Sequence, residues 1–455
     1  MKTVNVIGAG LAGVEAAYQL LKNGISVNLY EMKPKKFSPA HKNKNFCELV
    51  CSNSLKSNDI TTSGGLLKEE LRNLDSIVIK FADKYSVPAG SALAVDRDVF
   101  SKEITDYIKS FKNLNIIEEE VTSIPNDYPT IIATGPLTSE SLIEDIRKML
   151  GQENFYFFDA IAPIVNYDTI NFDIAFVQDR YNKGSGEGDY INLPFTKEQY
   201  DIFYQELINA KIVQLKDFEN KKVFEGCMPI EVLAKRGYDS MRFGPLKPVG
   251  ITDPKTNKTP YAVVQLRRET NCNDIYNIVG FQTNLTFDEQ KRVFRLIPGL
   301  ESVEFSRFGT MHKNTYINSP TCLNKYFQLK SNNNIFFAGQ ISGVEGYVES
   351  IASGLMVGIN MVHFVNNIEL IDFGSDTIIG NLSKYISTFN SSNFQPMSAN
   401  MGLLNTTQLK IKDKKEKYTI LAKRSIDEIL NIKEKLKENN YEIWWYNNYS
   451  CKKRQ

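Results

Sequence analysis

The chain lacks the features that mark several large protein classes. Only 3 of its 455 residues are histidine, and its 6 cysteines are scattered along the whole length. Scattered cysteines do not form a disulfide framework, and no second Cys or His pair accompanies Cys47 and Cys51 at ligand spacing, so we expect no metal site. The formal net charge is only +1. Because the whole protein carries no charge excess, a polyanionic partner would have to meet a local basic patch.

The sequence also shows no apolar run long enough to suggest a membrane-spanning segment. No run reaches the length of a membrane span, and the chain opens directly into a predicted strand without a basic and then apolar leader. There is no internal repeat and no low-complexity tract. We therefore expect a cytoplasmic protein of two or three domains with no membrane partner.

The strongest positive signal lies in residues 4–31, VNVIGAGLAGVEAAYQLLKNGISVNLYE. A short apolar run precedes three glycines spaced G-x-G-x-x-G, a helical pattern follows, and a second β-like run ends at an acidic residue. This order is typical of a dinucleotide-binding βαβ unit, with the phosphates at the helix N-terminus and the carboxylate near a ribose. A glycine-rich turn in a purely structural βαβ unit is the alternative. The cofactor-binding residues predicted here are Gly8, Ala9, Gly10, Leu11, Ala12, Gly13 and Glu31.

Two later stretches are expected to return to the same site. Residues 130–135, TIIATG, form an apolar strand that ends in glycine, a signature seen in two-domain flavoproteins. Residues 334–361 contain an apolar strand, a Gly-rich turn and a helix rich in small residues that can approach a sheet or a cofactor closely. A buried core helix without a ligand is the alternative. The residues predicted to bind the cofactor are Gly135, Gly339, Gln340, Gly343, Glu345, Gly346 and Tyr347.

Between these stretches the pattern changes and divides the chain. From about residue 155, aromatic and β-branched residues alternate with Gly-rich breaks, which predicts an α+β insertion with mostly antiparallel strands. We expect a Rossmann-like α/β domain in two parts, residues 1–155 and 326–455, around an inserted domain at 156–325. The second part is predicted to end in a lysine-rich helix over residues 409–438.

Three stretches could supply a local basic patch. Five lysines and a histidine fall between residues 33 and 44 with no acid among them, and basic residues also gather on a predicted strand and along the C-terminal helix. Such residues can contact the phosphates of RNA or of a second cofactor, and a plain solvated surface is the alternative for each. The candidate RNA-binding residues are Lys33, Lys35, Lys36, Arg267, Arg268, Lys414 and Lys415.

Two cysteines and one histidine stand in distinctive contexts. Cys51 lies among small polar residues in LVCSNSLKS, and Cys227 lies in FEGCMPIE. A thiol in a turn or helix cap becomes reactive where a cation or a helix N-terminus lowers its pKa, whereas a buried structural cysteine is the alternative. His312 in RFGTMHKNTYI is either a ligand-binding residue or a hydrogen-bonded packing residue.

Six stretches together resemble the folate- and FAD-dependent tRNA (uracil-5-)-methyltransferases, the TrmFO family. They are VIGAGLAGVEAAYQL, ELVCSNSLKS, FEGCMPIE, FGPLKPVG, NIFFAGQISGVEGYVES and QPMSANMGLL, which is followed by KDKKEKY. The resemblance covers nearly the whole chain, and ELVCSNSLK with FEGCMPIE is its most specific part. A larger family, GidA/MnmG, shares the flavin-binding fold and adds a long C-terminal helical domain that this chain is too short to hold.

The resemblance implies that a uridine in RNA is converted to 5-methyluridine. The carbon would come from 5,10-methylenetetrahydrofolate, and the electrons from NADPH or NADH through FAD. Carbon 5 of uracil is a poor nucleophile, so a thiolate must first add to carbon 6. The resemblance points to Cys51 and Cys227 as catalytic, and we expect Cys227 to attack the base while Cys51 lies near the flavin. His312 and Glu345 fall in stretches suited to holding the folate.

Three alternatives stay open at this point. Some relatives act with the same chemistry on ribosomal RNA, and nothing in the sequence separates that target from the tRNA T-loop. A flavin reductase that acts on a small molecule would keep FAD but would not bind RNA, and an RNA-binding flavoprotein would transfer no methyl group. The sequence does not give the oligomeric state.

Overall fold

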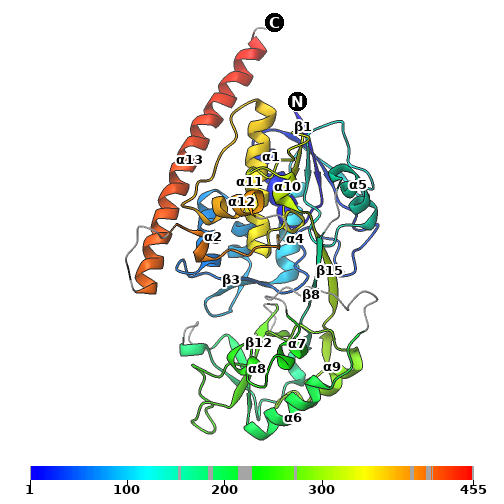
Figure 1. The fold of residues 1–455 in the computed structure, drawn as a ribbon, viewed down its shortest axis with the longest axis vertical. Helices are drawn as coiled ribbons and strands as arrows, with labels where there is room; N and C mark the ends of the chain where they lie inside the picture. The colour runs from blue at the N-terminus through cyan, green and yellow to red at the C-terminus, as the bar shows by residue number, and fades with distance from the viewer. Residues whose placement is uncertain are drawn as a thin grey trace.

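The computed structural model describes residues 2–151, 155–182, 188–213, 228–270, 274–389, 394–405, 411 and 413–452. Two bodies are visible in Figure 1, and a two-stranded ribbon runs between them. The ribbon pairs β8 (Phe155–Ala160) with β15 (Met311–Tyr316) in antiparallel register. The upper body contains both ends of the described chain, as expected for a domain built from two parts. The division at residues 155 and 325 stays a prediction, with this ribbon as the observed connection.

A five-stranded sheet forms the centre of the first domain, and all of its pairings are parallel. Its order is β16-β7-β1-β2-β6, so a strand from the last third of the chain lies beside strands from the first third. Carboxyl ends of parallel strands meet at one edge, where such sheets bind ligands. The strands are β1 (Thr3–Ile7), β2 (Ser26–Tyr30), β6 (Leu114–Ile117), β7 (Thr130–Ile132) and β16 (Ile335–Phe337). The predicted strands are confirmed, with ends shifted by a few residues.

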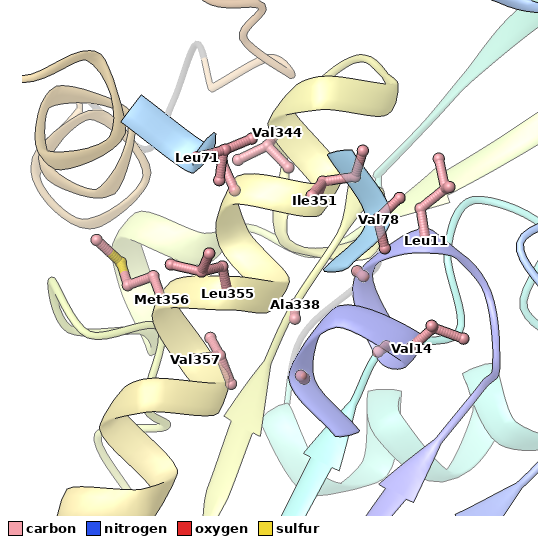
Figure 2. Packing of buried hydrophobic residues seen from close by; sticks show 14 of the residues in the cluster. Leu11, Val14, Leu71, Val78, Ala338, Val344, Ile351, Leu355, Met356 and Val357 are labelled. Carbon is pink, nitrogen blue, oxygen red and sulfur yellow. The ribbon is translucent and has the colours of Figure 1, made fainter. Parts of the chain in front are cut away.

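The helices α1 (Leu11–Lys22) and α11 (Tyr347–Asn366) pack directly against each other on this sheet. Figure 2 shows α11 crossing beside α1, with Leu355 and Val357 on the helix and Ala338 at the end of β16 between the two. A Cβ atom at Gly354 would lie 2.3 Å from the carbonyl oxygen of Ala12, and one at Gly358 would lie 2.9 Å from the Cα of Ala16. The small residues of α11 are therefore required for the contact, because a larger side chain would push the helices apart.

The same helix corrects one expectation from the sequence. α11 is 20 residues long and apolar enough to cross a membrane by length and composition, although we expected no such run. Almost all of its residues are buried inside the first domain. Its apolar composition is explained by packing on every side.

The remaining elements of the first domain surround this pair of helices. A three-stranded antiparallel sheet consists of β3 (Ser54–Ser57), β5 (Ala92–Val95) and β4 (Ser86–Val87). The helices are α2 (Ser63–Asn73), α3 (Ile77–Lys84), α4 (Arg97–Lys109), α5 (Glu140–Leu150), α10 (Ser319–Cys322) and α12 (Ile378–Thr388).

The C-terminal helix α13 (Lys414–Lys452) runs along the outside and extends beyond the body of the domain (Figure 1). It packs on α2 through buried residues that include Leu421 and Ile429. The hydroxyl of Ser425 donates to the buried carboxylate of Glu70 at 2.5 Å, and that carboxylate also accepts the backbone N–H groups of Ile378 and Ile379. Burial raises the pKa of Glu70 to about 7. One carboxylate thus joins α2, α12 and α13.

The second domain is built on a six-stranded sheet whose pairings are all antiparallel. In sheet order the strands are β10 (Phe176–Val177), β11 (Tyr190–Phe195), β12 (Ala262–Arg268), β13 (Ile275–Ile278), β9 (Ile164–Asn166) and β14 (Phe305–Arg307). Its helices are α6 (Lys197–Ile208), α7 (Ile230–Lys235), α8 (Ser240–Phe243) and α9 (Phe287–Phe294). A separate hydrophobic core fills this domain. The predicted fold class, a Rossmann-like α/β domain with an inserted α+β domain, is confirmed.

The contact between α1 and α11 leads to a prediction about stability. We expect Gly354→Ala to lower the free energy of unfolding of the flavin-free protein by about 1–3 kcal/mol, because the added methyl group overpacks the interface. Thermal or urea unfolding measures the change. Gly10→Ala is the matched control, because a Cβ there meets no described atom within 4 Å. Equal stability of Gly354→Ala and the wild type would show that the two helices can separate at no cost.

Candidate cofactor and thiol site

A cavity opens at the carboxyl edge of the parallel sheet, with an empty volume of about 1110 Å³ that reaches solvent. Segments far apart in the sequence line it, because β1, β7 and β16 all end at this edge. They are the loop after β1, residues 133–139 after β7, and the turn after β16. The predicted cofactor residues that line the cavity are Gly8, Ala9, Gly10, Leu11, Ala12, Glu31, Gly135, Gly339, Gln340 and Tyr347.

The three glycines of the first loop differ in what they allow. A Cβ at Gly8 would lie 2.6 Å from the oxygen of Ala133, and one at Gly13 would lie 1.8 Å from the oxygen of Gly8, so both positions are closed by backbone. A Cβ at Gly10 would meet no described atom within 4 Å. Gly10 is also the N-cap of α1. Because glycine has no side chain, no side chain caps the first N–H groups of this helix. The cavity floor therefore offers an open glycine and a helix N-terminus, which fit a pyrophosphate.

Glu31 connects this loop to the end of β2. Its buried carboxylate accepts hydrogen bonds from the backbone N–H of Ala9 at 3.0 Å and of Lys33 at 2.9 Å. A carboxylate has further lone pairs, so Glu31 can also accept from a ribose hydroxyl. The structure adds a positioning contact to the ligand contact that the sequence suggested.

The turn after β16 forms the opposite wall. The backbone N–H of Gly339 donates to the hydroxyl of Ser353 at 2.7 Å, which fixes the start of the turn on α11. Gln340 donates from its side chain to the carboxylate of Glu345. Glu345 is buried and, with Gly13, Gly343 and Gly346, does not line the cavity. These four predicted residues lie outside the lining of this cavity, and their part in binding stays a prediction.

Cys51 directly follows Val50, which lines the cavity, and its loop is bonded to Tyr347 of the first domain and to Arg267 of the second. The hydroxyl of Tyr347 accepts the backbone N–H groups of Cys51 at 2.8 Å and of Ser52 at 3.3 Å. The Cys51 thiol is half-buried, and its sulfur lies 4.0 Å from the carbonyl oxygen of Ala160 at the end of β8. Tyr347 begins α11, so the helix that forms one wall also holds the thiol loop.

Arginines that the sequence analysis missed surround this loop. Arg97 forms a buried ion pair with Glu269 at 2.7 Å, and Arg307 donates to the carbonyl oxygen of Val50 at 2.8 Å. Burial lowers the pKa of Arg307, and the nearby charge of Arg97 lowers it further. Arg97, Glu269 and Arg307 also line a wider hollow beside the thiol loop. They come from three distant segments, so only the tertiary fold could reveal the cluster.

The structure corrects two of the predicted RNA-binding residues. Lys33 is buried, and its ammonium donates to the carbonyl oxygen of Asn45 at 2.6 Å and lies 3.6 Å from Glu48. Arg267 is buried as well, and it donates to Ser52 at 2.7 Å and to Asn53 at 3.0 Å. Both cations hold internal loops, so they are not displayed to a large anion.

The other predicted residues fall into two groups. Lys35, Lys414 and Lys415 are exposed, Lys36 pairs with Glu120 at 2.6 Å, and Arg268 is partly exposed. Cys227 and the side chain of His312 lie outside the described residues, although the backbone of His312 belongs to β15. Within the described ranges, no group of three or more His, Cys, Asp or Glu residues is arranged to hold a metal ion.

The open glycine gives a direct test of the cavity. We expect Gly10→Ala to raise the Kd for FAD by about tenfold or more, because the methyl group occupies space that a bound pyrophosphate needs. Titration of the flavin-free protein with FAD, followed by flavin fluorescence, measures the affinity. Leu150→Ala, at the end of α5 away from the cavity lining, serves as the control. Unchanged affinity in Gly10→Ala would place the cofactor elsewhere.

Comparison with known proteins agrees with this geometry. The model of the family described as "Glucose inhibited division protein A" (GIDA) matches residues 3–369. Two crystal forms of Aquifex aeolicus GidA superpose with TM-scores of 0.67 and 0.65 at 17% and 18% identity. They cover 99% and 98% of this chain, and this chain covers 76% and 80% of theirs. At that identity the likeness establishes the fold alone.

Much more similar relatives are named methylenetetrahydrofolate–tRNA-(uracil-5-)-methyltransferase TrmFO. The protein of Bacillus pumilus is 55% identical over 433 residues, which are 95% of this chain and 99% of the relative. That of Caldicellulosiruptor bescii is 57% identical over 424 residues, 93% and 97% of the two chains. That of Listeria innocua is 55% identical over 435 residues, 96% of this chain and all of the relative. The chain therefore belongs to the TrmFO family of methylenetetrahydrofolate–tRNA-(uracil-5-)-methyltransferases, within the wider GidA family.

Proposed function

We propose that this protein is an FAD-dependent methyltransferase that forms 5-methyluridine in tRNA with carbon from 5,10-methylenetetrahydrofolate. The observation that carries this proposal is identity above 50%, along nearly the full length, to proteins named for that reaction. The cavity is consistent with it, because an open glycine, a helix N-terminus and a ribose-side carboxylate meet at one sheet edge. The target uridine is in the T-loop of tRNA.

The residues around the cavity would bind FAD by its polar parts. The first turn of α1 offers N–H donors to the pyrophosphate, and Glu31 offers an acceptor to the ribose. The turn after β16 and Tyr347 would border the bound cofactor, and the hydroxyl of Tyr347 also holds the loop of Cys51. When bound and reduced, the flavin supplies the hydride that turns a transferred methylene group into a methyl group.

The chain itself supplies the nucleophile. A thiolate, for which we propose Cys227, adds to carbon 6 of uracil and makes carbon 5 nucleophilic enough to attack the one-carbon unit. Loss of the proton from carbon 5 then allows the thiolate to leave. Cys51 sits where a second thiol can act in proton transfer, held by the hydroxyl of Tyr347. The arginines Arg97 and Arg307 place positive charge near that thiol, and Arg97 is itself paired with Glu269.

Several finer assignments belong to the same proposal. NADPH or NADH reduces the flavin, His312 and Glu345 help to hold the folate, and the protein works in the cytoplasm. The residues whose side chains are exposed or partly exposed remain candidates for contacts with RNA phosphates; they are Lys35, Lys36, Arg268, Lys414 and Lys415. If they make such contacts, RNA binding weakens as the salt concentration rises.

One assay separates the possible functions. Purified protein is mixed with 5,10-methylenetetrahydrofolate, NADPH or NADH, and unmodified transcripts of tRNA or of ribosomal RNA segments, and 5-methyluridine is measured by mass spectrometry. The proposal expects the product in tRNA. 5-Methyluridine found only in ribosomal RNA would identify ribosomal RNA as the substrate. Oxidation of NADPH or NADH without 5-methyluridine in either RNA would indicate a flavin reductase.

The two cysteines give the prediction for mechanism. We expect Cys227→Ala to abolish methyl transfer and also the covalent adduct with RNA that carries 5-fluorouridine, because no thiol can then add to carbon 6. Cys51→Ala should lower methyl transfer strongly. Cys322→Ala is the control, since Cys322 lies in α10 and does not line the cavity. A persistent 5-fluorouridine adduct in Cys227→Ala would assign the nucleophile to another residue.

A further inference from the structure

A motif of the second domain has no part in the reaction just described. The sequence FGPLKPVG, residues 243–250, begins at the last residue of α8, and α7 and α8 lie in the lower body of Figure 1. Phe243 is the last residue of α8 and is 81% exposed. No other large hydrophobic side chain in the described part of the chain is as exposed. Single exposed hydrophobic residues are common on protein surfaces, so the case for binding depends on the neighbours of Phe243.

The residues beside Phe243 are firmly anchored. Met241 and Leu246 are fully buried in the core of the second domain. The guanidinium of Arg242 lies 3.7 Å from the ring centroid of Tyr261, and its Nε donates to the carbonyl oxygen of Tyr261 at 3.0 Å. Both flanks of Phe243 are thus held by the core and by Tyr261, while its own side chain stays exposed. Its exposure is therefore built into the turn.

A second exposed aromatic ring lies at the other end of the motif. Tyr181 is 62% exposed and has a left-handed backbone with φ of +56°. Its backbone N–H donates to the carbonyl oxygen of Gly250 at 3.0 Å, and its ring fills the space beside that glycine. Arg180 donates to the carbonyl oxygen of Val249 at 2.9 Å. The end of the motif thus holds Tyr181 in an unfavourable backbone conformation with its ring exposed to solvent.

Cations dominate the charged groups of this segment. The chain as a whole is nearly neutral, but the cations of residues 228–260 are Lys235, Arg236, Arg242, Lys247, Lys255 and Lys258. Of the acids in the same range, Glu231 and Asp253 are buried, and Asp239 is paired with Arg242 at 2.6 Å. The carboxylate of Glu231 accepts hydrogen bonds from the backbone N–H of Asn284 and the hydroxyl of Thr283. The exposed side of the segment is therefore positively charged.

We propose that Phe243 and its cationic surroundings form a docking surface for the RNA substrate, on which an unpaired base stacks against the Phe243 ring. The proposal rests on the proposed function, which makes RNA the substrate. Proteins commonly recognise unpaired RNA bases by stacking them on aromatic rings, with lysine and arginine on the phosphates. A second copy of the chain fits less well, because the cores of protein interfaces are depleted in lysine. The segment also follows directly after Cys227 in the chain, which suits a surface that presents RNA to that thiol.

The test compares RNA affinity among variants of the full-length, FAD-loaded protein. Phe243→Ala should raise the Kd for an unmodified tRNA transcript by about tenfold, and Phe243→Trp should restore most of the loss, because stacking needs only an aromatic face. Ile202→Ala is the control, since Ile202 is 58% exposed on α6 of the same domain. Fluorescence anisotropy at a fixed salt concentration gives the Kd, and the flavin absorbance spectrum reports that each variant is folded.

A second variant tests the electrostatic part. Lys247→Gln should weaken binding and lower the slope of log Kd against log salt by about one, as expected when one phosphate contact is lost. Wild-type affinity in Phe243→Ala would overturn the docking surface and leave the proposed function intact. A variant that changes the sedimentation of the protein but not its RNA affinity would assign the surface to a contact between copies. A wild-type protein that binds no RNA would overturn both proposals.

Discussion

The contact between α1 and α11 is the constraint on which the rest of the structure depends. Gly354 lets the backbone of α11 meet that of α1 at Ala12, which lies within the glycine loop of residues 8–13. The N-termini of both helices then lie at the same edge of the parallel sheet. The cavity is lined by residues from the start of the chain and by residues near 347. The contact between the two helices brings these two segments together. Tight packing here serves the geometry of binding as much as it serves stability.

The same helix also connects the cavity with the thiol. Tyr347, at the start of α11, accepts two backbone N–H groups from the loop that contains Cys51. From the second domain, Arg267 reaches the same loop through Ser52 and Asn53. A loop held by both domains gives the half-buried thiol a defined place where the two domains meet. The interface between the domains is in this sense part of the site.

Local sequence patterns predicted the fold and the cavity well, because strand periodicity and glycine spacing act over short stretches. Side-chain contacts between distant segments were beyond such patterns. Lys33 looked like part of an exposed basic loop, yet Asn45 and Glu48 enclose its ammonium. Arg267 looked solvated on a strand, yet it is buried against a loop more than 200 residues earlier in the chain. The exposure of Phe243 likewise depends on which of its neighbours reach the core.

Hydrogen–deuterium exchange with and without FAD tests the central claim most directly. If the glycine loop at residues 8–13 and the turn at residues 339–347 are two walls of one cofactor site, FAD must slow amide exchange in both segments over the same concentration range. The loop that contains Cys51 is hydrogen-bonded to Tyr347, so amide exchange in this loop should also slow when FAD binds. Protection of the first segment alone would contradict the account, because the second wall would then not touch the cofactor.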